Sequence, residues 1–307
     1  MKKRVISVLL CAAMVATMLI GCGGSTGSEQ KSDAPEKGSA EDFDWKNYEG
    51  TTINVMFNEH NYSKAVIEKI PEFEELTGIK VKYSSTPESN YFDKLNTSLS
   101  SRSGDTDVYM TGAYQVWEYA PAGYMEPLED YIDNPALTAE DYNYDDFMEG
   151  VVGSLKWDLV PGHKVGEGSQ WALPMGWELN NISYNKRVFE EKGLSVPKTT
   201  DELLETAKSL KEFNGTGTYG IAVRGTREWA TIHPGYMSLF ATWGAEDFAI
   251  EDGKLVCKLD SKEAIEMTDY WVNLIKEAGS TQWANATWYE CGKDLGAAKA
   301  AMMFDAS

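Results

Sequence analysis

The chain has 307 residues and a formal charge of −20, with 48 Asp and Glu residues against 28 Lys and Arg residues. A surface this acidic repels phosphate backbones, so the composition excludes nucleic acid as a partner. The three histidines show no metal-ligand spacing, and no motif predicts a metal ion or other cofactor.

The first element in chain order is a secretory signal. A basic start at residues 1–4 precedes an apolar stretch at 5–20, and Gly21 and Cys22 then open into Gly- and Ser-rich sequence. The apolar stretch is shorter than the ~20 residues of a membrane-spanning helix, so the pattern predicts a signal peptide over residues 1–21. The residues ending at Cys22 resemble the lipobox of bacterial lipoproteins. This predicts acylation of Cys22 and an extracytoplasmic protein, lipid-anchored to the outer face of the cell membrane.

Residues 22–44 contain almost nothing apolar and are rich in Gly, Ser, Glu, Lys and Asp. Such a segment cannot bury enough surface to fold, which predicts a flexible tether. The chain that follows is long enough for two compact lobes.

The first half of the folded part alternates strands with helices. The expected elements are, in order, a strand at 52–57, a helix ending at Gly78, a strand at 79–83, a helix at 90–101 and a strand at 106–110. Pro71 is expected to kink or restart the first helix. This alternation is typical of a parallel sheet covered by helices.

The same alternation resumes in the second half. The pattern predicts extended chain at 172–184, a helix beginning at Thr199, a strand at 219–223, a helix at 262–278 and a strand at 298–304. Glu202 lies three residues after Thr199, as in a capping box. The 262–278 helix is expected to bury the stripe Ile265, Thr268, Val272 and Ile275.

Several segments, in the same order along the chain, resemble bacterial extracellular solute-binding proteins of the maltose-binding protein group. Each match is short, but together they run from about residue 50 to the end. The matching segments are 74–81 (Glu-Glu-Leu-Thr-Gly-Ile-Lys-Val), 107–110, 122–128, 173–178 (Leu-Pro-Met-Gly-Trp-Glu), 183–186, 197–199, 243–245 and 300–303.

The resemblance implies a two-lobed α/β fold of the periplasmic-binding-protein type II class, with lobes at residues 45–176 and 177–307, both incomplete. Members of the group continue well past the Ala-Met-Met strand, so the chain is expected to be truncated at its C-terminus. The resemblance further implies a monomeric, non-enzymatic protein that captures a sugar and delivers it to the permease subunits of an ABC transporter.

Candidate ligand contacts follow from the rule that open α/β sheets bind ligands beyond the carboxyl ends of their strands. Sugars need flat aromatic faces together with fixed carboxylates, amides and guanidinium groups. The candidates are Asn58, Glu59, His60, Tyr114, Trp117, Trp177, Glu178, Arg224 and Trp229. By its position in the matched crossover segment, Glu178 corresponds to the glutamate that contacts sugar hydroxyls in the family. The expected ligand is a neutral oligosaccharide stacked on Trp177.

Each candidate has a structural alternative. Glu59 and His60 lie where helix caps occur, Trp177 could pack a hinge, and Trp117 could pack on the sheet. Gly176 is expected to begin a hinge over residues 176–181, because glycine tolerates unusual backbone angles.

Two other functions remain open at this stage: a lipid-anchored glycoside hydrolase, which would need two carboxyl groups at a defined separation, and the same fold binding a non-sugar solute. Cys257 and Cys291 could form a disulfide or remain free thiols.

Overall fold

The computed structural model describes residues 35–306, which form two compact units. The smaller unit combines 35–47 with 129–142, and the larger combines 48–128 with 143–306. The predicted signal peptide at 1–21 and the lipidation site Cys22 lie outside the described residues, as does most of the predicted tether.

A buried asparagine joins the two segments of the smaller unit, which contain η1 (Ala40–Asp42) and α5 (Glu129–Ile132). Asn134 is fully buried, and its Oδ1 accepts hydrogen bonds from the backbone N–H groups of Gly38 and Ala136, each at 3.1 Å. Its Nδ2 donates to the Glu36 carbonyl at 3.0 Å. The described end of the predicted tether is therefore hydrogen-bonded to residue 134.

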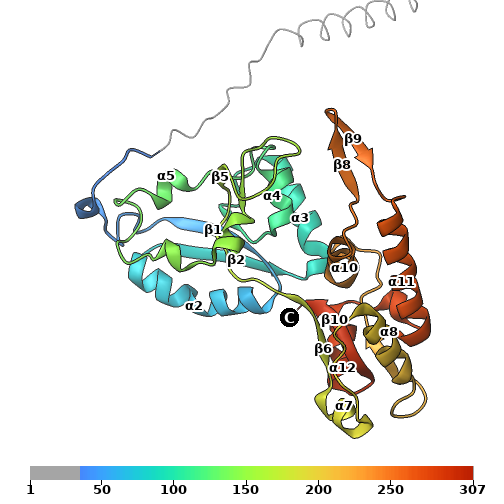
Figure 1. The fold of residues 1–307 in the computed structure, drawn as a ribbon. Coiled ribbons are helices and arrows are strands. Elements are labelled where there is room, and N and C mark those ends of the chain that lie inside the picture. The colour runs from blue at the N-terminus through green and yellow to red at the C-terminus, as the bar shows by residue number, and fades with distance from the viewer. Residues whose placement is uncertain (1–34, 307) are drawn as a thin grey trace, which may run out of the picture. The chain divides into compact units, whose positions relative to one another are not determined.

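The first sheet of the larger unit has the order β2-β1-β3 and is parallel throughout (Figure 1). Val55 of the central strand pairs with Tyr83 on one side and Val108 on the other. The strands are β1 (Thr52–Asn58), β2 (Lys80–Thr86) and β3 (Val108–Tyr109), and the helices are α2 (Asn61–Thr77), α3 (Glu88–Ser101) and α4 (Ala113–Tyr119). The predicted parallel arrangement is confirmed.

Two details of the first sheet concern helix α2 and the length of strand β3. Helix α2 runs through Pro71 without restarting, and it ends at Gly78, whose φ of 72° is the left-handed cap that glycine favours. Strand β3 is shorter than predicted because the Asp107 carboxylate accepts the Asn54 backbone N–H at 2.8 Å, in place of a strand carbonyl.

The second sheet has the order β6-β10-β7, in which β10 runs parallel to β7 and antiparallel to β6. Its strands are β6 (Asn180–Tyr184), β7 (Tyr219–Ala222) and β10 (Ala300–Ala306). The surrounding elements are α7 (Lys186–Lys192), α8 (Thr200–Ser209), α9 (Trp229–Ile232), η3 (His233–Met237), α10 (Ser238–Thr242), α11 (Lys262–Ala278), η4 (Trp283–Asn285) and α12 (Trp288–Gly296). Thr199 caps α8 as predicted by accepting the Glu202 N–H at 3.2 Å.

Helix α11 has the predicted bounds, but its buried face differs from the expected stripe. Ile265 and Val272 are exposed. The buried face instead comprises Ala264, Met267, Tyr270, Trp271, Leu274, Ile275 and Ala278. The stripe prediction was wrong, except at Ile275, because the large side chains of Met267, Tyr270, Trp271 and Leu274 form a different and wider apolar face at helical spacing.

Two short hairpins complete the larger unit. β4 (Lys156–Trp157) pairs with β5 (Ser169–Gln170) after η2 (Tyr144–Asp146) and α6 (Glu149–Gly153), and β8 (Phe248–Glu251) pairs with β9 (Lys254–Cys257). Cys257 is exposed and Cys291 is buried, and both are free thiols. Burial raises the pKa of Cys291 to about 12, which keeps it protonated and inert at neutral pH.

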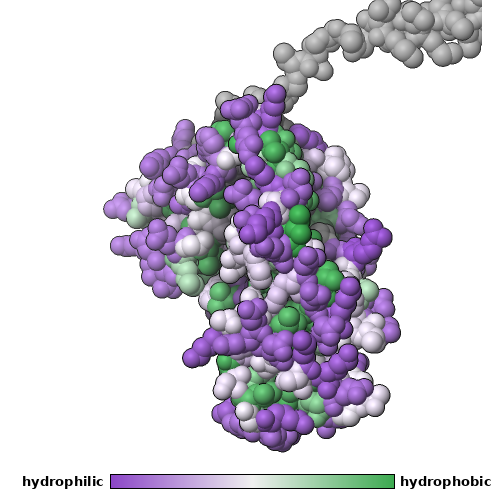
Figure 2. Space-filling model, turned by 45° about the vertical axis from the view of Figure 1, so that its right-hand side comes forward, coloured by the Kyte–Doolittle hydropathy of each residue, from purple (hydrophilic) through white to green (hydrophobic). Residues whose placement is uncertain are grey.

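The described surface is mainly hydrophilic, with apolar residues scattered among polar ones on the face drawn in Figure 2. No helix within residues 35–306 combines the length and apolar character needed to span a bilayer.

Candidate functional site

The carboxyl end of β1 carries three of the predicted contacts, each in a different environment. Asn58 is 6 % exposed, and Glu59 is on the surface. His60 caps α2: its Nδ1 accepts the Tyr62 backbone N–H at 3.3 Å, and its own N–H is accepted by the Ser63 hydroxyl at 2.9 Å. The capping alternative is therefore confirmed for His60. Because Nδ1 accepts, Nε2 carries the proton.

That proton faces the crossover segment. His60 Nε2 lies 3.4 Å from Glu178 Oε1, and the Tyr62 hydroxyl donates to the Trp177 carbonyl at 2.6 Å. The Trp288 ring lies 6.5 Å from that of His60, centroid to centroid. The start of α2 and the crossover are therefore brought together around two predicted residues, Trp177 and Glu178.

Gly176 allows the contact between Tyr62 and the crossover segment through its lack of a side chain, whereas the expectation was that it supplies unusual backbone angles. A Cβ at residue 176 would lie 2.5 Å from the Tyr62 ring, so the absence of a side chain lets that ring pack against the crossover. Its φ lies outside the left-handed region, so close approach explains the glycine better than unusual backbone angles do. Trp177 is 47 % exposed, so it is not a core residue.

The first turn of α4 supplies Tyr114, which stacks on His233 with ring centroids 5.2 Å apart and planes 15° apart. Burial of its hydroxyl, with smaller contributions from the Glu88 and Glu178 carboxylates, raises the pKa of Tyr114 well above its usual range. Loss of solvent and the Arg224 charge lower the pKa of His233. Trp117 is 53 % exposed, so it does not pack on the sheet.

Arg224 follows β7 and forms an ion pair with Asp305 of the second sheet. Its Nε and Nη2 donate to Asp305 Oδ1 at 2.9 and 2.5 Å, and its Nη1 donates to the Ala230 carbonyl at 2.9 Å. Asp305 lies in the central strand β10 and is 2 % exposed. Trp229 begins α9, but its side chain lies outside what the structure describes.

Asp305 was not among the predicted residues, although the sequence contains a signal for it. It is the single acid in the apolar strand Ala300–Ala306, and buried acids are rarely left unpaired. Tyr62 and His233 were also missed. Their partners lie far away in the sequence, so no local pattern identifies them.

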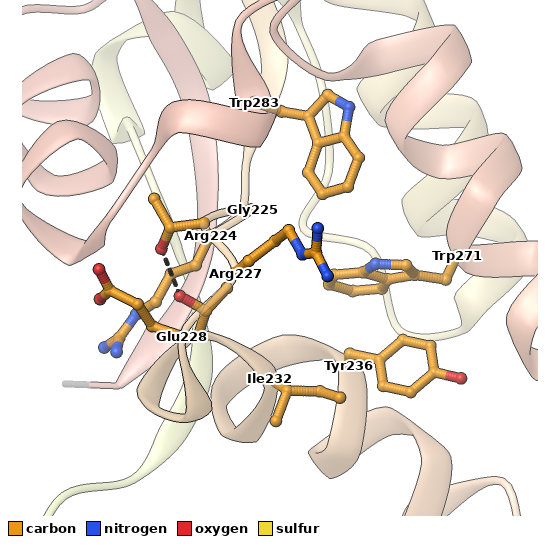
Figure 3. A pocket seen from close by; sticks show the side chains of 10 residues that line it. Arg224, Gly225, Arg227, Glu228, Ile232, Tyr236, Trp271 and Trp283 are labelled. Atoms are coloured by element: carbon orange, nitrogen blue, oxygen red, sulfur yellow. Dashed lines mark hydrogen bonds between the residues drawn. The ribbon is translucent and has the colours of Figure 1, made fainter.

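A cavity of about 480 Å³ lies beside Arg224 in the second half of the larger unit, within the usual size range of small-molecule sites. Its walls include the indoles of Trp271 and Trp283, and Figure 3 shows the Arg227 side chain entering the space that they bound. The Thr226 and Thr231 hydroxyls, 2.6 Å apart, close one wall. Trp271 is buried in the core and still contributes to the lining.

The described residues include no group of three or more His, Cys, Asp or Glu side chains that could hold a metal ion. The groups around the sites above are carboxylates, amides, a guanidinium and phenols beside indole faces, a combination that suits a polyhydroxylated ligand.

Comparison with known proteins agrees with this chemistry. The family model described as bacterial extracellular solute-binding protein matches residues 58–307. The chain is 37 % identical over 296 residues to an erythritol/L-threitol-binding protein of Mycolicibacterium smegmatis, covering 96 % of this chain and 61 % of the relative. It is 26 % identical over 228 residues to a mannitol-binding protein of Pseudomonas aeruginosa, covering 74 % of this chain and 46 % of the relative.

Solved structures support the fold. An ABC transporter solute-binding protein from Agrobacterium radiobacter in complex with ribitol superposes with a TM-score of 0.71 at 21 % identity, covering 84 % of this chain and 61 % of that one. One from Agrobacterium vitis with bound D-mannitol gives 0.68 at 23 %, covering 84 % and 58 %. The chain thus spans about three fifths or less of these relatives. The predicted two-lobed α/β fold is confirmed, and the chain belongs to the bacterial extracellular solute-binding protein family.

Proposed function

We propose that this chain is the ligand-capturing part of an ABC importer and that its ligand is a small linear polyol. The observation that carries the proposal is the 37 % identity, over 96 % of the chain, to a protein named for binding erythritol and L-threitol. The ligand expected from the sequence, an oligosaccharide, is revised accordingly. The partners are the permease subunits of the transporter, and the protein acts as a monomer.

The site chemistry supports a polyol. Each polyol hydroxyl can both donate and accept a hydrogen bond, and each carbon carries C–H groups that pack on an aromatic face. Glu178 offers acceptors beside the exposed Trp177 indole, and Arg224 offers donors near the cavity. A four- to six-carbon polyol needs only a few such groups, whereas an oligosaccharide needs an extended platform.

Titration calorimetry on the full-length protein tests the ligand class. Erythritol, L-threitol, ribitol, D-mannitol and maltotriose should be titrated in parallel, with each mixture analysed for products. We expect saturable binding of at least one polyol, no binding of maltotriose and no turnover. Binding of maltotriose alone would restore the oligosaccharide expectation, and release of hydrolysis products would favour the glycosidase alternative.

Two variants test the site. Trp177→Ala removes the indole face, and Glu178→Gln removes a charge that contributes about 1.5–3 kcal/mol in a hydrogen bond. Each should weaken the best polyol about tenfold or more, since ~1.4 kcal/mol corresponds to a factor of ten. If both variants bind that polyol as tightly as the parent, Trp229 and Glu59 become the next pair to test.

The location is also part of the proposal: an extracytoplasmic protein held to the outer face of the membrane by acyl chains on Cys22. Cys22→Ala should shift the full-length protein from the membrane to the soluble fraction. A variant that stays with the membrane would contradict the lipid anchor without affecting the ligand proposal.

A further inference from the structure

Two buried side-chain atoms within residues 35–306 have no hydrogen-bond partner: Asn58 Oδ1 and Asp305 Oδ2. Both are acceptors. Asn58 is the last residue of β1, the central strand of the first sheet, and Asp305 is next to last in β10, the central strand of the second. The two orphaned acceptors therefore occupy equivalent positions, at the edge of each sheet where α/β proteins bind ligands.

The geometry around Asp305 leaves one specific oxygen open. A guanidinium usually binds a carboxylate with one N–H on each oxygen. Here Arg224 places both Nε and Nη2 on Oδ1, and the Ala306 backbone N–H adds a third donor to that oxygen at 2.7 Å. Nη1 is tied to the Ala230 carbonyl, which fixes the guanidinium in this pose. Oδ2 has no donor among residues 35–306.

An unsatisfied acceptor in this position is costly, because a buried carboxylate oxygen has lost water and gained nothing in return. A neutral O–H donor satisfies it without adding charge to a pair that Arg224 already neutralises. Water does not reach Oδ2 in this structure, so a ligand hydroxyl reaches it only when the side chains around it move aside, and it then meets little competition from solvent. Arg224, which holds Oδ1 of this carboxylate, is also one of the residues that line the cavity.

We propose that Asp305 is a specificity-determining residue of the ligand site: its Oδ2 accepts a hydrogen bond from one ligand hydroxyl while Arg224 holds Oδ1. The inference rests on the proposed polyol-binding function and assigns one hydroxyl of the ligand to one atom of the protein. Asn58 Oδ1 is a second acceptor for the same class of donor, on the first sheet.

The test compares erythritol with two analogues that each lack one hydroxyl. 1,2,4-Butanetriol lacks an internal hydroxyl, and butane-1,2,3-triol lacks a terminal one. Calorimetry on the full-length parent should give a preference of at least about tenfold for erythritol over one analogue, as expected for a lost hydrogen bond to a charged group. In Asp305→Asn that preference should fall to within about threefold, because the acceptor has lost its charge.

The matched control is Asp294→Asn. Asp294 Oδ2 accepts from the Tyr219 hydroxyl at 2.7 Å and from Lys299 Nζ at 2.9 Å, so it is a paired carboxylate of the same region whose acceptor is already occupied. This variant should keep the parent's preference. Equal loss of preference in both variants, or an unchanged preference in Asp305→Asn, would overturn the proposal.

Arg224→Lys covers the case in which Asp305→Asn does not fold. Lysine keeps the positive charge but cannot place two fixed N–H groups on one oxygen, so the preference should drop at least about threefold. A folded Arg224→Lys protein with the parent's preference would also overturn the proposal. If the parent binds erythritol but shows no preference over either analogue, only the Asp305 assignment fails. If the parent binds no polyol, the proposed function fails with it.

Discussion

The two sheets each have three strands around one buried central strand, but different interactions stabilise them. The central strand β10 is buried along most of its length, inside a large apolar cluster that includes Ile221, Leu274 and Met302. The central strand β1 is buried only over residues 55–58, and the cluster against it is small. Polar bonds do more there: the Tyr91 hydroxyl lies 2.9 Å from the Met56 carbonyl and 2.5 Å from that of Met110. The second sheet thus depends mainly on packing, and the first depends more on specific hydrogen bonds.

The largest expected effect comes from disrupting the apolar cluster around the second sheet. Leu274→Ala in the full-length protein should lower the free energy of unfolding by about 2–5 kcal/mol, through lost burial and the cavity left behind. Urea denaturation measures it. Leu255→Ala, at a leucine that is 70 % exposed, should change stability by less than about 0.5 kcal/mol. Similar losses in the two variants would mean that the second cluster does not carry the stability assigned to it.

Tyr91→Phe should destabilise the first sheet, which depends more on hydrogen bonds. The ring stays in the small cluster, but the carbonyls of Met56 and Met110 lose their shared donor, which should cost about 1–3 kcal/mol. Tyr83→Phe, at a half-exposed tyrosine of the same sheet, provides the matched control and should be nearly neutral. If Tyr91→Phe is as stable as the parent, the hydroxyl is not what joins β1 to β3.

A smaller effect tests the contact between the first sheet's helix and the crossover. Gly176→Ala should push the Tyr62 ring away and break its bond to the Trp177 carbonyl, with a loss of about 0.5–1.5 kcal/mol. In a Tyr62→Ala background the same change should be close to neutral, because the clash is gone. Equal costs of Gly176→Ala in the two backgrounds would show that the glycine serves another purpose.

The smallest effect is the pH dependence due to His233. Its pKa is lowered in the folded state, so below about pH 6.5 the unfolded chain binds the proton first and stability falls as the pH drops. His233→Gln should flatten part of this fall in denaturation midpoints measured between pH 8 and pH 5. At pH 8, where His233 is neutral in both states, the difference between parent and variant reports packing alone. Parallel curves for the two proteins would contradict the assignment.

Local signals predicted the elements well where one physical requirement dominates. Gly78 ends α2 because only a left-handed cap fits there, and Thr199 begins α8 because its hydroxyl meets an open N–H. The buried face of α11 matched the predicted stripe only at Ile275, because large side chains at 267, 270, 271 and 274 form a wider apolar face. Strand β3 was overestimated because a side-chain carboxylate replaced part of its ladder.

In the candidate site, too, local sequence signals predicted some features and only the structure showed others. The rule for strand ends pointed to Asn58, which ends β1, and to Arg224, which follows β7. Their contact with a ligand, like that of the exposed Trp177, stays a prediction. Sequence alone could not say that His60 caps a helix and faces Glu178 at once, or that Tyr114 stacks on a histidine more than a hundred residues away.

What the sequence by itself determined is therefore the alternation of strands and helices, their caps and the family. These depend on neighbours within a few residues or on an ordered set of short motifs. Only the tertiary structure decided which polar groups are paired and which are left over, because pairing depends on distances between strands far apart in the chain. Asp305 illustrates the difference. The sequence predicts its strand, but only the structure shows that Arg224 donates to Oδ1 and leaves Oδ2 without a partner among the described residues.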